Sequence, residues 1–338
     1  MRIEKNISLK PFNTFNVDAI AKYFSEVNNH SEFRDVLHNK ELRTEKKLIL
    51  GGGSNVLFTK DLDGIVIKIN NSEIEVISET EENILIQVDA GVEWDSFVKY
   101  TIDEGICGLE NLSLIPGNVG AAPIQNIGAY GVEVKDFIEN VNVMMISDLE
   151  EKSYSNLECN FSYRNSIFKN ELKNKFLITS VLFKFSKRNK INLTYAPLND
   201  YFAGKSENEI SLVNLRDAVI SIRESKLPDP NKLGNAGSFF KNPIITKEKY
   251  EELKVEYPDL NGYPENNSNV KISAGWLIEK CGLKGKRIGD VGVHEKQALV
   301  IVNYGNSSGS EILQFSKMIQ SEVENKFNIK LINEVNIL

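Results

Sequence analysis

Apolar and polar residues alternate over several stretches of the first two hundred residues, and this period of two predicts β-strands. The strands are expected at 64–69, 73–77, 84–88, 137–146 and 176–185. A short, continuous apolar run at 48–50 predicts one more strand, buried on both faces. Helical spacing predicts a helix at 93–104 that is closed by Gly105, and another helix that follows Ser31.

From residue 209 onward the apolar residues recur at helical spacing. Four of them form a stripe along one helix face: Leu212, Leu215, Val219 and Ile222. This stripe predicts a helix that ends before Pro228. Beyond it we expect helices at 247–256 and 273–281, a strand at 298–302, a long helix opened by a Ser308–Glu311 capping box, and a closing strand at 329–338. The order of strands, helix, glycine-rich stretch and further strands favours an α+β fold over a doubly wound parallel sheet.

Residues 113–131 contain no charged side chain, although charged residues make up 26% of the chain. Four glycines in this run permit backbone turns and a close approach of main chain to a ligand. An uncharged surface rich in amides suits a large, flat ligand whose phosphates are bound by N–H groups. The alternative is a purely structural glycine-rich loop, which composition alone favours.

A second glycine-rich turn, Gly51-Gly52-Gly53-Ser54-Asn55, follows the apolar run at 48–50. A buried strand that ends in such a turn is a common phosphate-binding arrangement. It is not the dinucleotide fingerprint, because Val56 stands at the third glycine position and no helical pattern follows. A Rossmann domain is therefore not expected.

Composition excludes several classes of protein. The formal charge of −7 and the absence of a basic tract argue against nucleic-acid binding. No apolar run is long enough for an export signal or a membrane span, so a cytoplasmic protein is expected. The three cysteines and three histidines are too widely separated for a metal site, and the thiols are expected to be reduced.

Three residues could carry chemistry. Ser238 lies between a glycine and two phenylalanines, where a hydroxyl could donate a proton to a basic carbon; the alternative is a turn serine. Arg164 could bind a carboxylate through its planar fork, or pair with a surface acid. Glu334 is expected on the face of the last strand opposite Ile329, Leu331 and Val335. In a cleft its carboxyl would stay protonated and donate to an anion; in water it would only be solvated.

Further candidates lie near the expected domain junction. Tyr195 and Lys226 offer a phenol and a cation that suit a diphosphate, although lysines are usually only solvated. His294, close to Gln297, is expected to support the fold.

Together these residues resemble one family, the UDP-N-acetylenolpyruvoylglucosamine reductases, from Asn13 to Ile337. Five segments carry the resemblance, in the order of the family: GGGSNVLF at 51–58, IPGNVGAAPIQNIGAYG at 115–131, YRNSIF at 163–168, NAGSFFKNP at 235–243 and AGWLIE at 274–279. Two departures are mild. Ala121 and Ala122 stand where some members carry serines, and the chain ends soon after Glu334.

The resemblance implies an FAD-binding fold of the vanillyl-alcohol-oxidase (PCMH) type in three parts. These are subdomains at 1–63 and 64–227, the latter with a loop near Tyr195 that closes over substrate, and a substrate-binding domain at 228–338. It implies non-covalent FAD, NADPH as co-substrate and a monomer. The residues expected around FAD are Gly51, Gly52, Gly53, Ser54, Asn55, Pro116, Gly117, Gly120, Ala121, Gln125, Asn126, Gly128, Ala129 and Tyr130.

The implied reaction reduces UDP-N-acetylglucosamine enolpyruvate to UDP-N-acetylmuramate, with hydride passing from NADPH to flavin N5 and then to substrate C3. Arg164 and Glu334 would stabilise the enolate-like anion, and Ser238 would protonate C2. Contacts to substrate are expected from Tyr195, Lys226, Asn242 and Gln297. Two alternatives stay open: an FAD oxidase on the same fold, and a nucleotide-sugar-binding protein without flavin.

Overall fold

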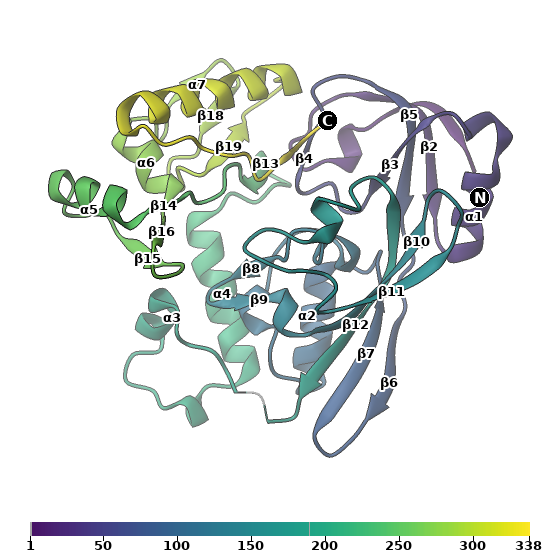
Figure 1. The fold of residues 1–338 in the computed structure, drawn as a ribbon, viewed down its shortest axis with the longest axis horizontal. Helices are drawn as coiled ribbons and strands as arrows, with labels where there is room; N and C mark the ends of the chain where they lie inside the picture. Colours follow the sequence, from purple (N-terminus) through teal and green to yellow (C-terminus); the bar gives the residue numbers. More distant parts are fainter. Residues whose placement is uncertain (1, 189) are drawn as a thin grey trace. The chain divides into compact units, whose positions relative to one another are not determined.

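The chain folds into two compact units, each assembled from several stretches of sequence. The structure is a computed structural model that describes residues 2–188 and 190–338 (Figure 1). The first unit comprises Met1–Ile7, Ala21–Gly53 and Leu62–Ser225, and the second comprises Ser8–Ile20, Ser54–Asp61 and Lys226–Leu338. The three-part division at 63 and 227 stays a prediction.

The first unit contains a four-stranded sheet in which the central strand is buried. Its strands, in spatial order, are β1 (Glu4–Ser8), β2 (Ile20–Val27), β5 (Leu62–Ile69) and β3 (Lys46–Leu50). β2 and β3 both run parallel to β5. Ile65, Val66 and Ile67 are fully buried, as expected of a parallel strand covered on both faces. Helix α1 (His30–His38) follows β2, and the Asn29 side chain caps it by accepting from the N–H of Glu32.

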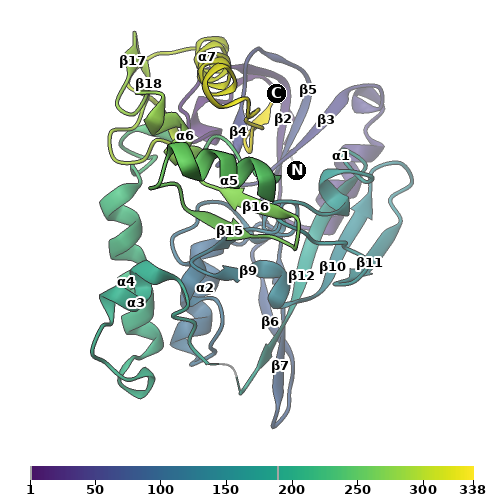
Figure 2. The ribbon, with the colours of Figure 1, turned by 60° about the vertical axis from the view of Figure 1, so that its left-hand side comes forward.

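A five-stranded antiparallel sheet forms the rest of the first unit's framework (Figure 2). Its spatial order is β11 (Glu151–Ser155), β10 (Ile138–Met145), β12 (Phe176–Ser186), β7 (Asn83–Asp89) and β6 (Ile74–Glu79). Helix α2 (Trp94–Asp103) packs on this sheet, with the ring centroids of Phe97 and Phe183 4.8 Å apart. Gly105, at φ +71°, ends the helix by donating to the Ile102 carbonyl.

Two further helices of the first unit follow the sheet in sequence, α3 (Ala196–Tyr201) and α4 (Leu212–Lys226). They share a small separate core that includes Leu198, Leu215 and Val219. Arg216 of α4 forms a two-pronged ion pair with Asp95 of α2, at 2.8 and 2.7 Å. This pair connects the two helices within the unit.

The second unit is built on two small antiparallel sheets and three helices. One sheet has the order β13 (Gly234–Ser238), β19 (Val300–Asn303), β18 (Val291–Val293) and β17 (Arg287–Ile288), and the other has β14 (Ile244–Thr246), β16 (Asn269–Ile272) and β15 (Gly262–Pro264). A short parallel pair joins β4 (Val56–Leu57) to β20 (Asn336–Ile337). The helices are α5 (Lys247–Glu256), α6 (Ala274–Lys280) and α7 (Gly309–Phe327).

Most of the expected elements are present, and two expectations are wrong in detail. The Ser308–Glu311 capping box opens α7 as expected. The first helix, however, is capped by Asn29 and already contains Ser31, because Asn29 is the residue whose side chain meets a first-turn N–H. The closing strand shrinks to β20 and an isolated bridge at Asn333, because the main chain of 329–335 pairs with the distant segment 239–241 at that one bridge and forms no longer ladder.

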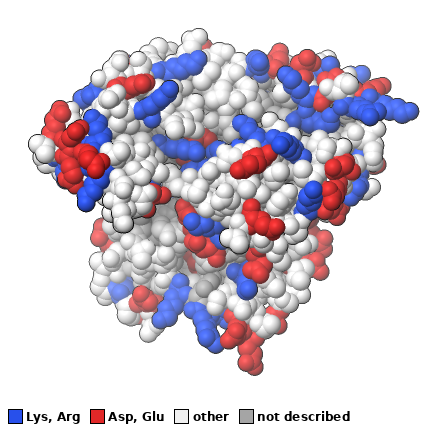
Figure 3. Space-filling model, viewed as in Figure 1, with Lys and Arg blue, Asp and Glu red and all other residues white. Residues whose placement is uncertain are grey.

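Charge and hydropathy agree with the composition. Basic and acidic side chains are interspersed on the face displayed in Figure 3. No helix in the described part of the chain is long and apolar enough to cross a membrane. Residues 2–188 and 190–338 also contain no group of three or more His, Cys, Asp or Glu side chains that could hold a metal ion.

Candidate active site

The two glycine-rich segments meet inside the first unit. A Cβ atom placed on Gly52 would lie 3.0 Å from both the Gly117 Cα and the Asn118 Oδ1. Asn118 is itself held in place because its Nδ2 donates to the Gly91 carbonyl at 2.6 Å. Glycine at position 52 therefore permits two main-chain turns to approach each other closely.

The first half of the uncharged run is held against residues 90–94 by main-chain hydrogen bonds. The Trp94 N–H donates to the Gly117 carbonyl, and the N–H groups of Val119 and Gly120 donate to the carbonyls of Val92 and Ala90, all at 2.9 Å. Pro116 and Ala121 are nevertheless exposed, and Gly117 and Gly120 are partly exposed. The result is a fixed, accessible and uncharged strip of main chain.

The second half of the run forms a tight hairpin. β8 (Gly128–Ala129) pairs with β9 (Val132–Glu133) through a two-residue turn in which Tyr130 and Gly131 both have positive φ, +51° and +85°. Two positive values are the signature of a type I′ turn, which glycine adopts easily and tyrosine rarely does. The Asn111 Nδ2 donates to the Tyr130 carbonyl at 2.8 Å and stabilises this conformation.

Two predicted FAD residues in this half are already engaged by side chains of the same unit. The side chain of Asn126, fully buried, donates to Glu133 and to the Ser162 carbonyl and accepts from the Lys135 N–H. The Gln125 Oε1 accepts from the Lys169 Nζ at 3.1 Å. The roles of both residues toward FAD stay predictions. Because its amide group is already bonded within the unit, Asn126 would contribute by holding the surrounding main chain in place.

Arg164 is oriented by the hairpin. Its Nη2 donates to the Gly128 carbonyl at 2.6 Å, its Nη1 donates to the Asn126 carbonyl at 3.3 Å, and its guanidinium lies 5.5 Å from the Tyr163 ring centre. Its backbone has φ +52°, an uncommon value for a non-glycine residue. Such strain at a partly exposed arginine is typical of a functional position.

Ser238 ends strand β13 in the second unit. The preceding residue, Gly237, has φ +66°, and its N–H donates to the Asn235 Oδ1, so the pairing of β13 with β19 is irregular between Asn235 and Ser238. On the far side of the irregularity, the Phe239 N–H donates to the Leu299 carbonyl at 2.8 Å. The backbone on both sides of Ser238 is therefore fixed, while Ser238 itself is partly exposed.

Glu334 lies in the same unit, on a segment whose main chain meets Phe239, the residue after Ser238. Its N–H donates to the Phe239 carbonyl at 2.8 Å, and the neighbouring pair Phe240 and Asn333 forms a β-bridge. The expected alternation holds, because Leu331 and Val335 are buried whereas Glu334 is partly exposed. The Asn55 Nδ2 also donates to the Glu334 carbonyl, at 3.4 Å, which brings the end of the Gly51–Asn55 turn next to this pair.

The structure thus brings two of the three predicted catalytic residues together. Ser238 and Glu334 occupy adjacent segments of the second unit, whereas Arg164 belongs to the first. The joint action of all three groups stays a prediction.

The predicted substrate contacts fall into two groups. The Tyr195 ring meets the Tyr130 ring edge to face at 5.2 Å in the first unit. In the second unit, the Asn242 Oδ1 accepts from the Ala274 N–H that begins α6, and the Gln297 Oε1 lies 3.3 Å from a Cβ placed on Gly275. Asn242 and Gln297 therefore flank the start of the same helix. Lys226, the last residue of α4, is exposed.

Sequence reasoning missed Arg223, a partly buried arginine of α4. Burial lowers the pKa of Arg223, a shift that the charge of Asp95 and a hydrogen bond to Tyr130 oppose. Burial likewise raises the pKa of the Tyr130 phenol. The spacing of the two arginines could have pointed to Arg223. Arg216 and Arg223 are seven residues apart, so they share one face of the helix.

The first unit fits FAD in shape and chemistry. Its exposed strip of main chain is uncharged and close-packed against a second glycine turn, which suits a flat ring system and a diphosphate bound by amides. Residues 21–148 match the family model described as FAD binding domain. The fold and the site therefore define an FAD-dependent oxidoreductase.

The comparisons specify which one. Residues 229–338 match the model described as UDP-N-acetylenolpyruvoylglucosamine reductase, C-terminal domain. The chain is 50% identical to the UDP-N-acetylenolpyruvoylglucosamine reductase of Flavobacterium johnsoniae over all of both chains, and 42% identical to that of Pseudomonas putida over 99% of this chain and 98% of the relative. The chain belongs to the UDP-N-acetylenolpyruvoylglucosamine reductase family.

A solved structure supports the fold. The crystal structure of UDP-N-acetylenolpyruvylglucosamine reductase from Thermus caldophilus has a TM-score of 0.69 with 24% identity, over 100% of this chain and 99% of that chain. At this identity the likeness concerns the fold, and it agrees with the predicted α+β architecture.

Proposed function

We propose that this protein reduces UDP-N-acetylglucosamine enolpyruvate to UDP-N-acetylmuramate with NADPH as electron donor, a step of peptidoglycan precursor synthesis. The single observation that carries the proposal is that the Glu334 main chain is bonded to Phe239, the residue after Ser238, so both candidates lie on adjacent segments where the backbone on both sides of Ser238 is fixed. Family membership over the full chain supports it. We further propose that the protein acts in the cytoplasm as a monomer.

FAD bound at this site would supply hydride transfer between NADPH and the enolpyruvyl group. The protein has to orient the substrate and stabilise the charge that develops on it. Gly51–Asn55 and residues 116–130 would hold the cofactor through main-chain amides. Tyr195, Lys226, Asn242 and Gln297 would hold the UDP-sugar.

Arg164 would stabilise the anion that forms when the substrate carboxylate takes on enolate character. The carbonyls of Gly128 and Asn126 fix the plane of its guanidinium before substrate arrives, so little reorganisation is needed. Glu334, in its protonated form, would donate to the same anion. Such groups accelerate the reaction only if they bind the anion better than the starting carboxylate.

Ser238 would protonate C2 of the substrate. A serine hydroxyl is a weak acid, so its role depends on stabilisation of the alkoxide that is left behind. The positive φ of Gly237 and the irregular pairing next to it turn the Ser238 side chain out of the regular strand pattern.

A single-turnover experiment tests this function. The FAD-loaded protein is reduced anaerobically with one equivalent of NADPH and mixed with the enolpyruvyl sugar in heavy water. We expect the visible flavin band to return and UDP-N-acetylmuramate to form with one solvent deuterium at C2. A reduced flavin that reacts rapidly with oxygen but not with the enolpyruvyl sugar would instead identify an oxidase.

A further inference from the structure

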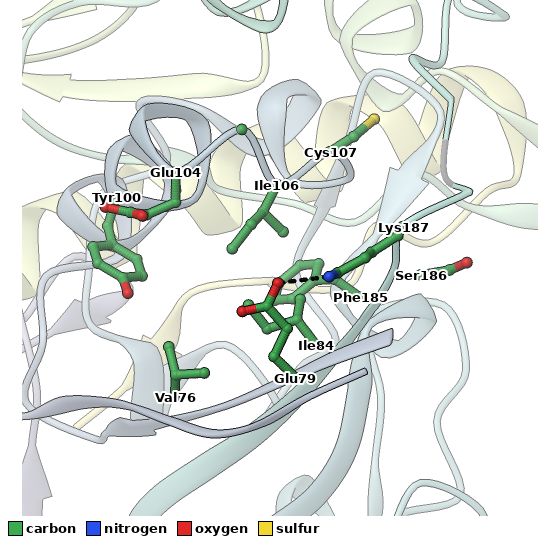
Figure 4. A pocket seen from close by; sticks show the side chains of 11 residues that line it. Val76, Glu79, Ile84, Tyr100, Glu104, Ile106, Cys107, Phe185, Ser186 and Lys187 are labelled. Atoms are coloured by element: carbon green, nitrogen blue, oxygen red, sulfur yellow. Dashed lines mark hydrogen bonds and ion pairs between the residues drawn. The ribbon is translucent and has the colours of Figure 1, made fainter. Parts of the chain in front are cut away.

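A cavity of about 370 Å³ lies at the end of helix α2 in the first unit, apart from the residues assigned to FAD and substrate (Figure 4). Strands β6, β7 and β12 provide its floor and one wall, and the end of α2 with the segment Gly105–Cys107 provides the other. Its size falls at the lower end of the range of small-molecule pockets, about 300–1,000 Å³.

Apolar and aromatic side chains form one part of the cavity lining, beside polar and charged groups. Val76, Ile84, Tyr100, Ile106 and Phe185 line it, and Figure 4 shows the Ile106 side chain pointing into it. Val76, on the edge strand β6, is 44% exposed. A ligand with an apolar body would remove this surface from water.

The rim of the cavity favours a positive charge. Glu79 and Glu104 both contribute to it, and Glu79 is paired with Lys187 at 2.5 Å, so the Glu104 carboxylate is left in excess. The rim also coincides with the C-terminal end of α2, whose last turn carries no basic side chain. The helix dipole places partial negative charge there, and the Tyr100 ring offers a face to a cation.

We propose that this cavity is a binding site for a small amphipathic monocation, with an apolar or aromatic body and one ammonium group. The body would occupy the space between Ile106 and Val76, and the ammonium group would lie near Glu104 and the last carbonyls of α2.

Binding of tryptamine to the FAD-loaded protein tests the proposal. Indole-3-propionate, which carries the same indole ring but a negative charge, is the comparison ligand. Isothermal titration should give an affinity for tryptamine at least about tenfold higher than for indole-3-propionate at low salt, and the ratio should fall as salt is added. Equal affinities, or no binding of tryptamine in the millimolar range, overturn the proposal.

Two variants locate the binding. Val76→Trp fills the cavity and should abolish tryptamine binding. The control is Ile77→Trp, because the Ile77 side chain is 48% exposed and does not line the cavity. This control should leave tryptamine binding unchanged. Glu104→Gln, an exposed change that keeps the shape, should weaken tryptamine about threefold to tenfold without altering indole-3-propionate. If Ile77→Trp weakens binding as much as Val76→Trp, or if Glu104→Gln has no effect, the cation binds elsewhere and the assignment fails.

Discussion

Arg164 owes its orientation to two main-chain carbonyls, and this arrangement depends on the planar shape of the guanidinium. A lysine ammonium keeps the charge but cannot contact the Gly128 and Asn126 carbonyls and present a flat fork to a carboxylate at the same time. The chemistry of the site thus rests on geometry as well as on charge.

We predict that Arg164→Lys slows reoxidation of the reduced flavin by the enolpyruvyl sugar about a hundredfold, the usual scale for loss of one oriented anion-stabilising group. Stopped-flow absorbance measures the rate. Flavin reduction by NADPH, which does not involve the enolate, should be nearly unchanged. Arg188→Lys, at an exposed arginine paired with Glu82, is the matched control; if both variants behave alike, Arg164 has only a structural role.

For Ser238, replacement by alanine should slow product formation about 10²- to 10⁴-fold, as expected for loss of a general acid. Ser238→Cys retains an ionisable proton and should lose less. Quenched single turnovers with analysis of the deuterium at C2 measure the step directly. Ser268→Ala, at an exposed loop serine of the same unit, should be silent. A Ser238→Ala protein that makes product at the parent rate would remove the serine from the mechanism.

The residues of the site were predictable to different degrees. Glu334 followed from simple alternation, because Leu331 and Val335 had to face the core. The left-handed backbone of Arg164 and of Tyr130 did not follow from sequence, since both residues normally avoid it and only the surrounding hydrogen bonds impose it. Arg223 was overlooked because, from sequence alone, a partly buried arginine at the edge of an apolar stripe resembles a solvated one.

Among the elements, α2 and α4 are connected by the pair Asp95–Arg216, whose side chains are only 22% and 13% exposed. Burial raises the pKa of Asp95, but the hydrogen bonds from Arg216 and from the Leu114 N–H outweigh it, and the pKa lies below the ordinary value of 3.8. The carboxylate form is therefore stabilised by folding.

Asp95→Asn should lower the free energy of unfolding by about 2–3 kcal/mol at pH 7, because Arg216 would keep a partly buried, unpaired charge. The contribution of Asp95 is complete above the unfolded pKa of 3.8 and is lost as the pH falls through the lower folded pKa. As the pH falls from 3.8 through the lower folded pKa, the free energy of unfolding should therefore decrease less for Asp95→Asn than for the parent protein. Urea titrations at several pH values measure this, with Asp103→Asn, in an exposed pair with Lys99, as the control.

Elements with a strong period were located well from sequence. Helix α5 was placed at its observed bounds, and β12 and α2 were each within a residue or two. The hairpin of β8 and β9 was not foreseen, since four residues in two strands leave no periodic signal and the turn contains a tyrosine where asparagine or glycine is usual. The final strand was predicted too long, because alternation of apolar and polar residues shows which side chains are buried but not which main-chain groups pair with another strand.

Across the whole molecule, the second unit draws its core from distant parts of the sequence. Phe15, Val17 and Leu57 pack with residues from Ala236 to Val335. The Phe15 carbonyl accepts from the Asn303 Nδ2 at 3.0 Å, and a Cβ on Gly234 would lie 2.4 Å from the same carbonyl oxygen. The second unit therefore combines residues 8–20 and 54–61 with residues 226–338.

We predict that a fragment of residues 228–338 does not fold stably by itself, whereas addition of a peptide covering residues 8–20 and 54–61 restores structure. Circular dichroism and amide exchange measure this. In the full chain, Phe15→Ala should lower the stability of the second unit by about 3–5 kcal/mol, since Phe15 is fully buried against Phe239. Tyr263→Ala, at a 59% exposed side chain of the same unit, should cost little. A fragment that folds cooperatively alone would contradict the prediction.

The assembly of this core from distant parts of the sequence has a consequence for synthesis on the ribosome. Phe15 and Val17 emerge first, but their packing partner Phe239 is translated more than two hundred positions later. At about 5–20 residues per second, this leaves the early apolar segment waiting on the order of ten seconds or more. During that interval it is a natural target for a chaperone that holds nascent chains, and slower translation of the middle of the message should lower the yield of native protein.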